Sequence, residues 1–338
     1  GPPPSPRQGQ TMKLMTPARL LQGRSETTTA EAEKISLPVA EQEGGMGAVL
    51  VAAGKLQDVP YNLRWAEFPA AGPRGEALNA GAVDAGFIGD APLLFAEAGG
   101  ARVKAIAVAK SDAYGTALLV NAGSPLTSAA SLKGKSIATN RGSIGQFVAL
   151  KALAAAGLSA RDVTFRFLDP ADAKLALIRG SVDVWATWEP YTAFAETQDH
   201  LRVLVNGRGL WSGNTFVAAT DSALANPEKR RALQDFLHRL SDAQQWANQH
   251  PDSYSQTLSK IIGFPQDAVK LSFERRHMAW QPIDAQTVAQ QQQTADFYHQ
   301  SGLLPVALQV APTFDYSFTL SGPAGGKAPD ASRQQEVQ

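Results

Sequence analysis

The sequence predicts an α/β protein made of two similar lobes. From Lys34 onward, short apolar runs alternate with segments of helical periodicity, a pattern typical of strand–helix units around a mostly parallel sheet. A short sequence pattern also occurs twice. Residues 77–85 (ALNAGAVDA) and 177–185 (LIRGSVDVW) each place a glycine after a helical segment and Val-Asp at the start of a strand. Each copy then leads into a loop with an acidic residue and a proline, so the two lobes are expected to share a local architecture.

The first lobe is expected to alternate strands with helices from residue 34 onward. Short apolar runs predict strands over 35–40, 63–68, 83–89, 105–109 and 116–120. Helical spacing of apolar residues predicts helices over 47–56 and 75–79. Another helix is expected to begin at Asp90, which suits an N-cap, with Pro92 in the first turn, where its missing N–H is tolerated.

The second lobe is expected to repeat this order. Strands are predicted over 136–139, 163–168 and 182–188, and helices over 144–156 and 171–178. Gly157 is expected to end the first of these helices, whereas Asp169-Pro170 opens the second and Gly180 closes it.

The chain is then expected to return to the first lobe and to end in helices. A strand over 216–219 precedes helices over 227–249, 252–262, 266–273 and 285–300. The first lobe therefore combines 34–120 with 216–321, and the second lobe is 121–215. Residues 1–33 and 322–338 lack periodicity, so both segments are expected to be disordered.

Composition excludes several classes of function. The 338 residues carry 31 basic and 31 acidic side chains, so neither nucleic acid nor an anionic membrane is an expected partner. There are no cysteines, which excludes thiol catalysis and thiolate metal sites, and the five histidines lack metal-ligand spacing. No cofactor is expected. No intact signal peptide or membrane span is expected either, because Pro17 and Arg19 interrupt the run over 13–21 and no run reaches ~18 apolar residues.

Two segments resemble nucleotide-binding motifs, but each lacks a required glycine. Gly134-Lys135-Ser136 lacks the first glycine of a phosphate loop, because position 129 is alanine. Gly45-Met46-Gly47 lacks the third glycine of a dinucleotide fingerprint, because position 50 is leucine. What remains are loops rich in Gly, Ser and Asn before helices, at 43–47, 89–91 and 140–146, where free N–H groups favour a small oxyanion.

Several stretches carry a resemblance to a known family: 65–70 (WAEFPA), 89–92 (GDAP), 169–173 (DPADA), 180–191 (GSVDVWATWEPY) and 291–296 (QQQTAD). From about Lys34 to Phe318, the chain resembles the periplasmic aliphatic-sulfonate-binding proteins of ABC importers. The resemblance implies a type II periplasmic binding-protein fold, in which two α/β lobes close a ligand cleft over one solute. It also implies a periplasmic protein that delivers an organosulfonate or sulfate ester to an ABC permease, and we expect a monomer.

The resemblance further implies which residues hold the ligand. The first lobe supplies Gln42, Gly44, Gly45, Met46, Gly89 and Asp90, and the second supplies Ser143, Ile144, Gly145, Gln146, Trp188 and Glu189. Arg141 and Arg276 are candidates for a charge-assisted bond to the sulfonate. Bulky side chains that suit a larger or aromatic R group are Trp188, Phe147, Phe216 and Trp280.

The sequence departs from the family pattern in three places. Residues 42–45 read Gln-Glu-Gly-Gly where Gln-Lys-Gly-Ser is usual, Glu189 replaces an aspartate, and residues 275–278 read Arg-Arg-His-Met where His-Arg-Pro-Pro is common. Replacing the lysine with Glu43 removes a cation near the anion loop. Backbone amides are therefore expected to carry more of the binding.

Some candidates also have a purely structural interpretation. Asp90 suits a helix N-cap, and its carboxylate repels an anion unless it points into its own helix. Glu189 before Pro190, and Ser143 before its helix, suit capping as well. Trp185 is expected in the core, because strand alternation places it on the opposite face from Ala186.

Three functions of different classes remain open. The favoured one is a solute-binding protein that closes about a hinge when it binds an organosulfonate or sulfate ester. The second is an enzyme on the same two-lobed frame, such as a desulfinase, although such enzymes depend on a cysteine or histidine in the cleft and this chain has no cysteine. The third is a binder of taurine, nitrate or another small anion, in which Glu43 or Glu189 would face the ammonium group of taurine.

Overall fold

The computed structural model describes residues 13–15, 34–42, 44–68 and 71–320, and these form two compact units. Unit 1 is Gly1–Lys110, Asn214–His250 and Ala279–Gln338. Unit 2 is Ser111–Gly213 and Pro251–Met278.

Unit 1 is built on a seven-stranded sheet with the order β1-β3-β2-β4-β11-β5-β12. Its strands are β1 (Lys13–Met15), β2 (Ser36–Glu41), β3 (Asn62–Glu67), β4 (Ala85–Gly89), β5 (Val103–Lys110), β11 (Asn214–Thr220) and β12 (Ala279–Gln281). β2 runs parallel to β3 and β4, whereas β1, β11 and β12 pair antiparallel with their neighbours. The expectation of a mostly parallel sheet is therefore wrong: the sheet is mixed, because distant segments re-enter it in the opposite direction.

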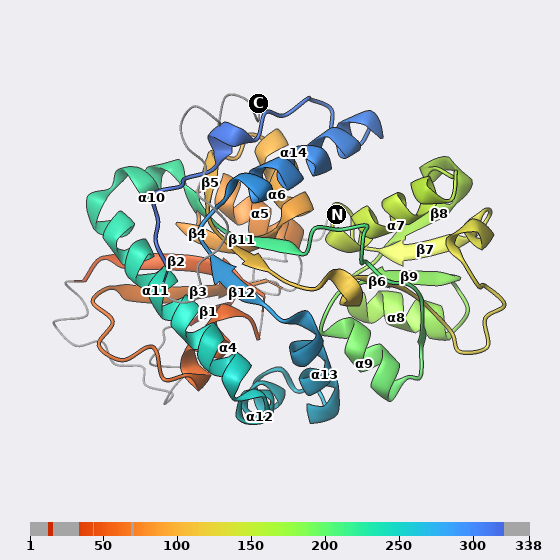
Figure 1. Ribbon diagram of the computed structural model, residues 1–338, viewed down its shortest axis with the longest axis horizontal. Helices are drawn as coiled ribbons and strands as arrows, with labels where there is room; N and C mark the ends of the chain where they lie inside the picture. Colours follow the sequence, from red (N-terminus) through yellow and green to blue (C-terminus); the bar gives the residue numbers. More distant parts are fainter. Residues whose placement is uncertain (1–12, 16–33, 43, 69–70, 321–338) are drawn as a thin grey trace, which may run out of the picture. The chain divides into compact units, whose positions relative to one another are not determined.

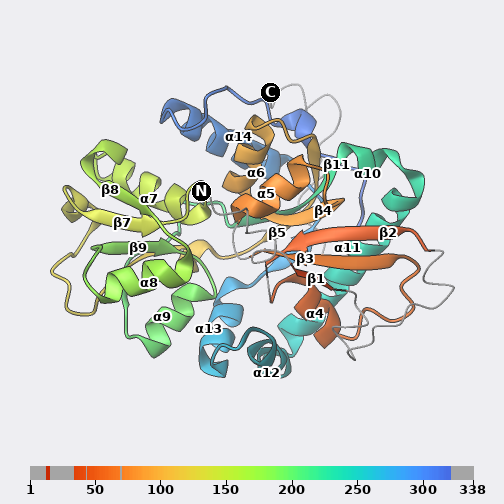
Figure 2. The ribbon, with the colours of Figure 1, turned by 180° about the vertical axis from the view of Figure 1, so that it is seen from behind.

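Helices cover both faces of the unit 1 sheet. They are α4 (Met46–Ala52), α5 (Ala71–Asn79), α6 (Asp90–Ala98), α10 (Asp221–Ala225), α11 (Pro227–Gln249) and α14 (Ala285–Gln300). Figures 1 and 2 show α5, α6 and α14 on one face and α4 and α11 on the other. Strand alternation supplies both contacts: Trp65 packs on Phe236 of α11 with ring centroids 5.9 Å apart, and Gly86 lies against Leu78 of α5.

Unit 2 is built on a five-stranded mixed sheet with the order β10-β6-β9-β7-β8. Its strands are β6 (Ala117–Val120), β7 (Ser136–Thr139), β8 (Thr164–Phe167), β9 (Val184–Thr187) and β10 (Arg202–Val205). β7 is parallel to β8 and β9, and β6 is antiparallel to β9 and β10. The carboxyl ends of β7, β8 and β9 therefore meet at one edge of the sheet.

Two hydrophobic clusters hold the unit 2 sheet between its helices α7 (Ile144–Ala155), α8 (Pro170–Ile178) and α9 (Tyr191–Gln198). Ala186 packs with α7 on one face. Trp185, which is 2% exposed, packs with α8 and α9 on the other. The prediction that Trp185 is a core residue is confirmed.

The helices α12 (Pro251–Ile262) and α13 (Gln266–Arg276) belong to unit 2, although the sequence analysis assigns them to the first lobe. They pack on each other through Tyr254 and Phe273, whose ring centroids are 4.7 Å apart. Phe264, between them, packs on Phe194 of α9 at 4.8 Å. These contacts join residues far apart in the chain, so local periodicity does not reveal them.

Three predicted elements match the structure at both of their boundaries. The strand over 136–139 and the helices over 227–249 and 285–300 are confirmed residue for residue. The segment expected to be disordered at 1–33 includes Lys13–Met15, which instead pairs with β3, while its other residues before Lys34, and 322–338, lie outside the described residues. The elements α9, α10, β10 and β12 are short and are absent from the prediction. None of the described helices has the length and apolarity needed to cross a membrane.

Candidate functional site

The loop that joins β7 to α7 forms a helix start in unit 2. Ser143 is the N-cap of α7: its Oγ accepts a hydrogen bond from the Gln146 N–H at 3.2 Å. The same hydroxyl donates to the Asn140 carbonyl at 2.7 Å. The predicted capping role of Ser143 is confirmed, and its hydroxyl proton is engaged by the protein.

Gly145 lets the first turn of α7 approach the end of β9. A β-carbon at this position would lie 2.8 Å from the Ala186 carbonyl oxygen and 2.9 Å from Thr139 Oγ1. Thr139 Oγ1 donates to that same carbonyl at 2.9 Å. No residue larger than glycine fits without a backbone shift, so the position of this helix start depends on Gly145.

This first turn offers two backbone donors. Among the described residues, no acceptor lies within hydrogen-bond reach of the Ile144 or Gly145 N–H. Gln146 is not available to a ligand in the same way, because its N–H already donates to Ser143 Oγ and its Oε1 accepts from the Gly142 N–H at 2.6 Å. Ile144 and Gly145 thus present unsatisfied N–H groups at the positive end of a 12-residue helix.

Glu189, at the end of β9, is held by the protein itself. Its Oε1 accepts from the Ala193 N–H at 2.9 Å, and its Oε2 accepts from Arg275 Nε at 2.5 Å. Arg275 also donates from Nη2 to Glu196 at 2.7 Å. Burial disfavours the charged guanidinium, but the hydrogen bonds and charges of Glu189 and Glu196 raise the pKa of Arg275 overall. Pro190, not Glu189, is the N-cap of α9, but Glu189 still accepts from a first-turn N–H and is neutralised by Arg275, so it is a structural carboxylate.

Arg276 differs from its neighbour. Its side chain is half-buried, and its guanidinium has no hydrogen bond or ion pair with any residue in the described part of the chain. Burial lowers the pKa of Arg276, and the charges of Glu189 and Tyr254 offset only part of this effect. Buried charges are normally paired, so this guanidinium lacks the anion that its environment calls for.

Two further predicted residues of unit 2, Arg141 and Trp188, have side chains that are at least partly exposed. The Arg141 guanidinium carbon lies 3.9 Å from the ring centroid of Phe167, and the Arg141 side chain is exposed. Trp188 is half-buried and meets Tyr191 edge-on, with centroids 6.0 Å apart.

In unit 1, the last residue of β2 is an acid that the sequence analysis missed. Glu41 is buried, and its Oε1 and Oε2 lie 3.0 and 3.2 Å from the donating Gly47 N–H. Burial raises the pKa of Glu41 to about 8, against the lowering effect of the Gly47 and Met46 N–H groups. The start of α4, predicted as an anion-binding loop, is therefore filled by the protein's own acid. An acidic residue at a strand end just before a glycine-rich loop was the available signal.

The other predicted residues of unit 1 differ in their exposure. Gln42, Gly44 and Gly45 are partly exposed, Met46 is 3% exposed, and Glu43 lies outside the described residues. Gly89, not Asp90, is the N-cap of α6, so the predicted cap is one residue off. Asp90 is the first helical residue, and its Oδ1 accepts from the Ala91 N–H at 2.6 Å.

The predicted aromatic walls are core residues in this structure. Phe216 is fully buried and packs edge-on against Phe314 with centroids 5.9 Å apart. Trp280 is 4% exposed and packs against Phe87, and Phe147 is 3% exposed. Only Trp188 of the four keeps an accessible surface, because the other three fill space between strands and helices.

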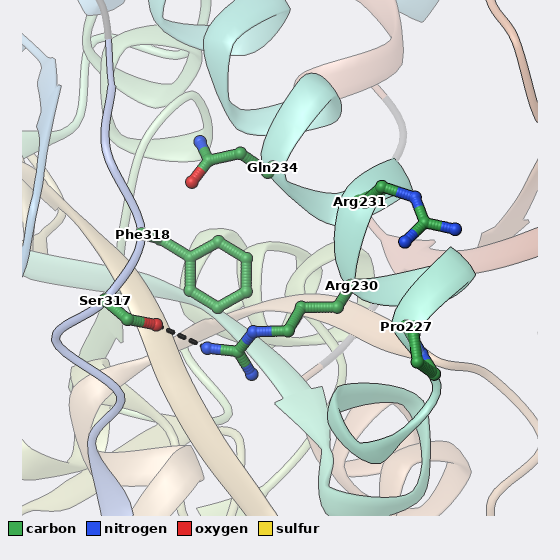
Figure 3. A pocket seen from close by; sticks show the side chains of 6 residues that line it. All are labelled: Pro227, Arg230, Arg231, Gln234, Ser317 and Phe318. Carbon is green, nitrogen blue, oxygen red and sulfur yellow. Dashed lines mark hydrogen bonds between the residues drawn. The ribbon is translucent and has the colours of Figure 1, made fainter.

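A surface pocket of about 310 Å³ lies elsewhere on unit 1, at the start of α11. Figure 3 shows Arg230 pointing toward Ser317 and Phe318, whereas Arg231 points away. Arg230 pairs with Asp315 at 2.9 Å, bonds Ser317, and stacks 4.8 Å from the Phe318 ring centroid. Arg230 thus fastens the C-terminal segment to α11, and the pocket contains none of the predicted ligand residues.

Comparison with known proteins places these features in a family. The family model described as NMT1/THI5 like matches residues 69–254. An aliphatic sulfonates-binding protein of Escherichia coli strain K12 is 33% identical over 299 residues, which cover 87% of this chain and 92% of that protein.

Two solved structures agree in fold. The alkanesulfonate-binding protein SsuA from Xanthomonas axonopodis pv. citri, bound to MOPS, matches with a TM-score of 0.77 and 32% identity over 84% of this chain and 99% of its own. The periplasmic aliphatic sulphonate binding protein SsuA from Escherichia coli matches with a TM-score of 0.76 and 30% identity over 88% and 97%. The expected two-lobed periplasmic binding-protein fold is confirmed. This chain belongs to the NMT1/THI5-like family, among the aliphatic-sulfonate-binding proteins of ABC importers.

Proposed function

We propose that this chain binds an organosulfonate or sulfate ester in the periplasm and delivers it to an ABC permease. The observation that carries this proposal is the coincidence, in unit 2, of two unsatisfied backbone N–H groups with an unpaired, half-buried guanidinium. The donors are the N–H groups of Ile144 and Gly145 and the side chain of Arg276. The relatives named above are binding proteins, so the role is capture and transport rather than catalysis.

The chemistry of a sulfonate head group suits these donors. A sulfonate has three oxygens that share one negative charge, and it accepts hydrogen bonds but donates none. Backbone N–H groups at a helix start bind such an anion without a charged side chain. A guanidinium adds a planar pair of donors that can meet two of the oxygens, and charge-assisted bonds of this kind are stronger than neutral ones.

In this proposal the two donor sets serve one site at the end of β9. A β-carbon on Gly145 would lie 2.8 Å from the Ala186 carbonyl oxygen, and Glu189, three residues further on, pairs with Arg275, the chain neighbour of Arg276. Three residues span at most ~11 Å of chain. This spacing supports one head-group site that uses both the backbone N–H groups and the Arg276 guanidinium. Glu189, neutralised by Arg275, would lie beneath this site and would not be a ligand.

The partly exposed residues of unit 1, Gln42, Gly44 and Gly45, stay proposed ligand contacts, together with Gly89. Met46 and Asp90 would act through backbone atoms, because their side chains are buried. Taurine is the weaker alternative: Glu189, a proposed partner for its ammonium group, is already paired with Arg275.

Isothermal titration calorimetry with methanesulfonate, ethanesulfonate, methyl sulfate, taurine and nitrate tests the proposal. Sulfonates and the sulfate ester should bind, and Arg276→Gln should weaken them by about tenfold or more, since a hydrogen bond to a charged group contributes roughly 1.5–3 kcal/mol. Arg179→Gln, which removes an exposed arginine at the end of α8, is the matched control and should leave affinity unchanged. Binding of nitrate alone, or equal effects of the two variants, would contradict the proposed site.

A further inference from the structure

An exposed cation and an aromatic ring form a shelf beside the proposed head-group site. The shelf consists of Arg141, Phe167 and Phe165: the Arg141 guanidinium lies 3.9 Å from the Phe167 ring centroid, and the Phe165 and Phe167 rings stack with centroids 6.0 Å apart. Phe167 is 37% exposed, which is unusual for a large apolar side chain that the sheet could bury. The guanidinium carbon thus lies over the Phe167 ring, and Phe165 supports that ring from β8.

Strand register fixes the shelf at the carboxyl end of the unit 2 sheet. Phe167 is opposite Thr139 in the β7–β8 ladder, and the Leu168 N–H donates to the Thr139 carbonyl at 2.9 Å. Phe165 packs against the same cluster as α7, so alternation places Phe167 on the α7 face as well. The shelf and the start of α7 therefore share one face and one end of the sheet.

Chain geometry keeps the shelf within reach of a bound head group. Arg141 precedes Ser143 by two residues, so their α-carbons are at most ~7.6 Å apart. Gly142, between them, has a φ of 72°, a left-handed conformation that turns the chain from the end of β7 into the helix start. Arg141 and the two N–H donors of Ile144 and Gly145 therefore belong to one short turn of the chain.

The electrostatics favour a neutral ring over a second anion. In the described residues, Arg141 has no ion pair and no hydrogen bond, so the face of its guanidinium is free to take a partner. Asn140, the adjacent residue, donates from Nδ2 to Asp169 at 3.2 Å, which keeps an exposed carboxylate beside the shelf. That carboxylate repels a second acidic group on the ligand, whereas it does not oppose an aromatic ring stacked on the guanidinium.

We infer that the Arg141–Phe167 shelf binds the ring of an arenesulfonate, so that this protein prefers aromatic sulfonates to saturated ones of the same size. This inference rests on the proposed function, since it takes the sulfonate to be held at the start of α7. It goes beyond that function because it assigns the R group of the ligand. It also makes the aromatic ring, and not the sulfonate, the binding partner of Arg141.

Paired ligands isolate the aromatic contribution. Benzenesulfonate and cyclohexanesulfonate have similar size and the same head group, and calorimetry gives the ratio of their affinities for one protein sample. The wild-type protein should bind benzenesulfonate about two- to fivefold more tightly, the range for a cation–π contact at an exposed site. Arg141→Gln should bring the ratio to about one and leave cyclohexanesulfonate affinity nearly unchanged. Phe167→Leu should lower the ratio as well, because it removes the support of the guanidinium.

Arg166→Gln is the matched control. Arg166 is exposed on β8 between the two phenylalanines, and alternation places it on the opposite face of the sheet. Its variant should keep the wild-type ratio. A wild-type ratio of one, an equal loss of both ligands in Arg141→Gln, or the same change in Arg166→Gln would overturn the inference. Methanesulfonate distinguishes failure of the shelf from failure of the proposed function. If it binds while benzenesulfonate and cyclohexanesulfonate have equal affinities, only the inference about the shelf is wrong. If no sulfonate binds, the proposed function is wrong as well.

Discussion

The Gly47 N–H donates to both carboxyl oxygens of Glu41, at 3.0 Å to Oε1 and 3.2 Å to Oε2. The carboxyl group of Glu41, at the end of β2, therefore occupies the helix start that a ligand anion would otherwise use. The fit is close, because a β-carbon on Gly47 would lie 2.7 Å from Glu41 Oε2 and 3.2 Å from the Trp65 ring. In unit 1 the Gly47 N–H is thus satisfied by the protein's own acid, whereas no acceptor in the described residues lies within reach of the Ile144 and Gly145 N–H groups of unit 2.

Glu41 should make folding stability depend on pH. Burial raises the pKa of Glu41 to about 8 in the folded protein, from an ordinary value of 4.5. The folded state therefore binds a proton that the unfolded state releases, and stability is fully present below pH 4.5 and declines until pH 8. The free energy of unfolding of Glu41→Gln, measured with urea at pH 5, 7 and 9, should decline less over this range than that of the wild type.

Glu76→Gln provides the comparison for Glu41→Gln, because Glu76 is an exposed acid on α5. It should keep the full pH dependence of the wild type. Some dependence should persist even in Glu41→Gln, since burial also raises the pKa of Glu97 to about 8. If the free energy of unfolding of Glu41→Gln and of Glu76→Gln depends on pH in the same way, Glu41 is ionised in the folded protein at neutral pH.

Gly145→Ala should disrupt the proposed head-group site. The new methyl group would meet two backbone or buried atoms, the Ala186 carbonyl oxygen and Thr139 Oγ1, within 3 Å. Overpacking of this kind costs about 1–3 kcal/mol, and α7 must shift away from β9 to relieve it. Thermal unfolding should show the loss of stability, and calorimetry with methanesulfonate should show weaker binding.

Gly72→Ala tests whether any glycine-to-alanine change has these effects. Gly72 lies in α5, and a β-carbon there would contact nothing within 4 Å. This variant should be neutral or stabilising by up to ~1 kcal/mol, because alanine favours helix, and its sulfonate affinity should be that of the wild type. Unaltered binding in Gly145→Ala would mean that the sulfonate does not use the start of α7.

The sequence identifies the helix start in unit 2 because all its determinants are local. Asn140, Ser143 and Gly145 lie within six residues, and capping rules apply to such a window directly. The position of Glu41 was equally visible, but its burial depends on the packing of neighbouring strands and helices, which local rules do not give. The partners of Glu189 were beyond prediction, since Arg275 is 86 residues away in the chain. Short elements such as β12 share this difficulty, because three residues form a strand only when a neighbour supplies the pairing.

The contact of Arg230 with the C-terminal segment should contribute to stability but not to binding. Arg230→Gln removes the ion pair with Asp315, the bond to Ser317 and the stack on Phe318, and should cost about 1–2 kcal/mol. Arg231→Gln, at the next position, removes an exposed arginine that Figure 3 shows pointing away from these residues, and should cost less than ~0.5 kcal/mol. Urea unfolding measures both. Weaker methanesulfonate binding in Arg230→Gln would contradict this prediction, because it would show that the pocket at α11 contributes to ligand binding.

The ion pair between Arg275 and Glu189 should be the main electrostatic support of the end of β9. Glu189 is 8% exposed, and Gly115 packs so closely on its carboxylate that no water shell can replace the guanidinium. Arg275→Gln should therefore cost about 3 kcal/mol, because it leaves a buried carboxylate without its cation. Arg208→Gln breaks a pair with Asp112 whose arginine is 64% exposed, and should cost much less, because an exposed pair is screened by solvent. The double variant Arg275→Gln with Glu189→Gln should recover part of the loss, since it removes the uncompensated charge as well. If unfolding in urea gives the double variant the sum of the two single losses, Glu189 and Arg275 do not interact, and Glu189 becomes available to a ligand after all.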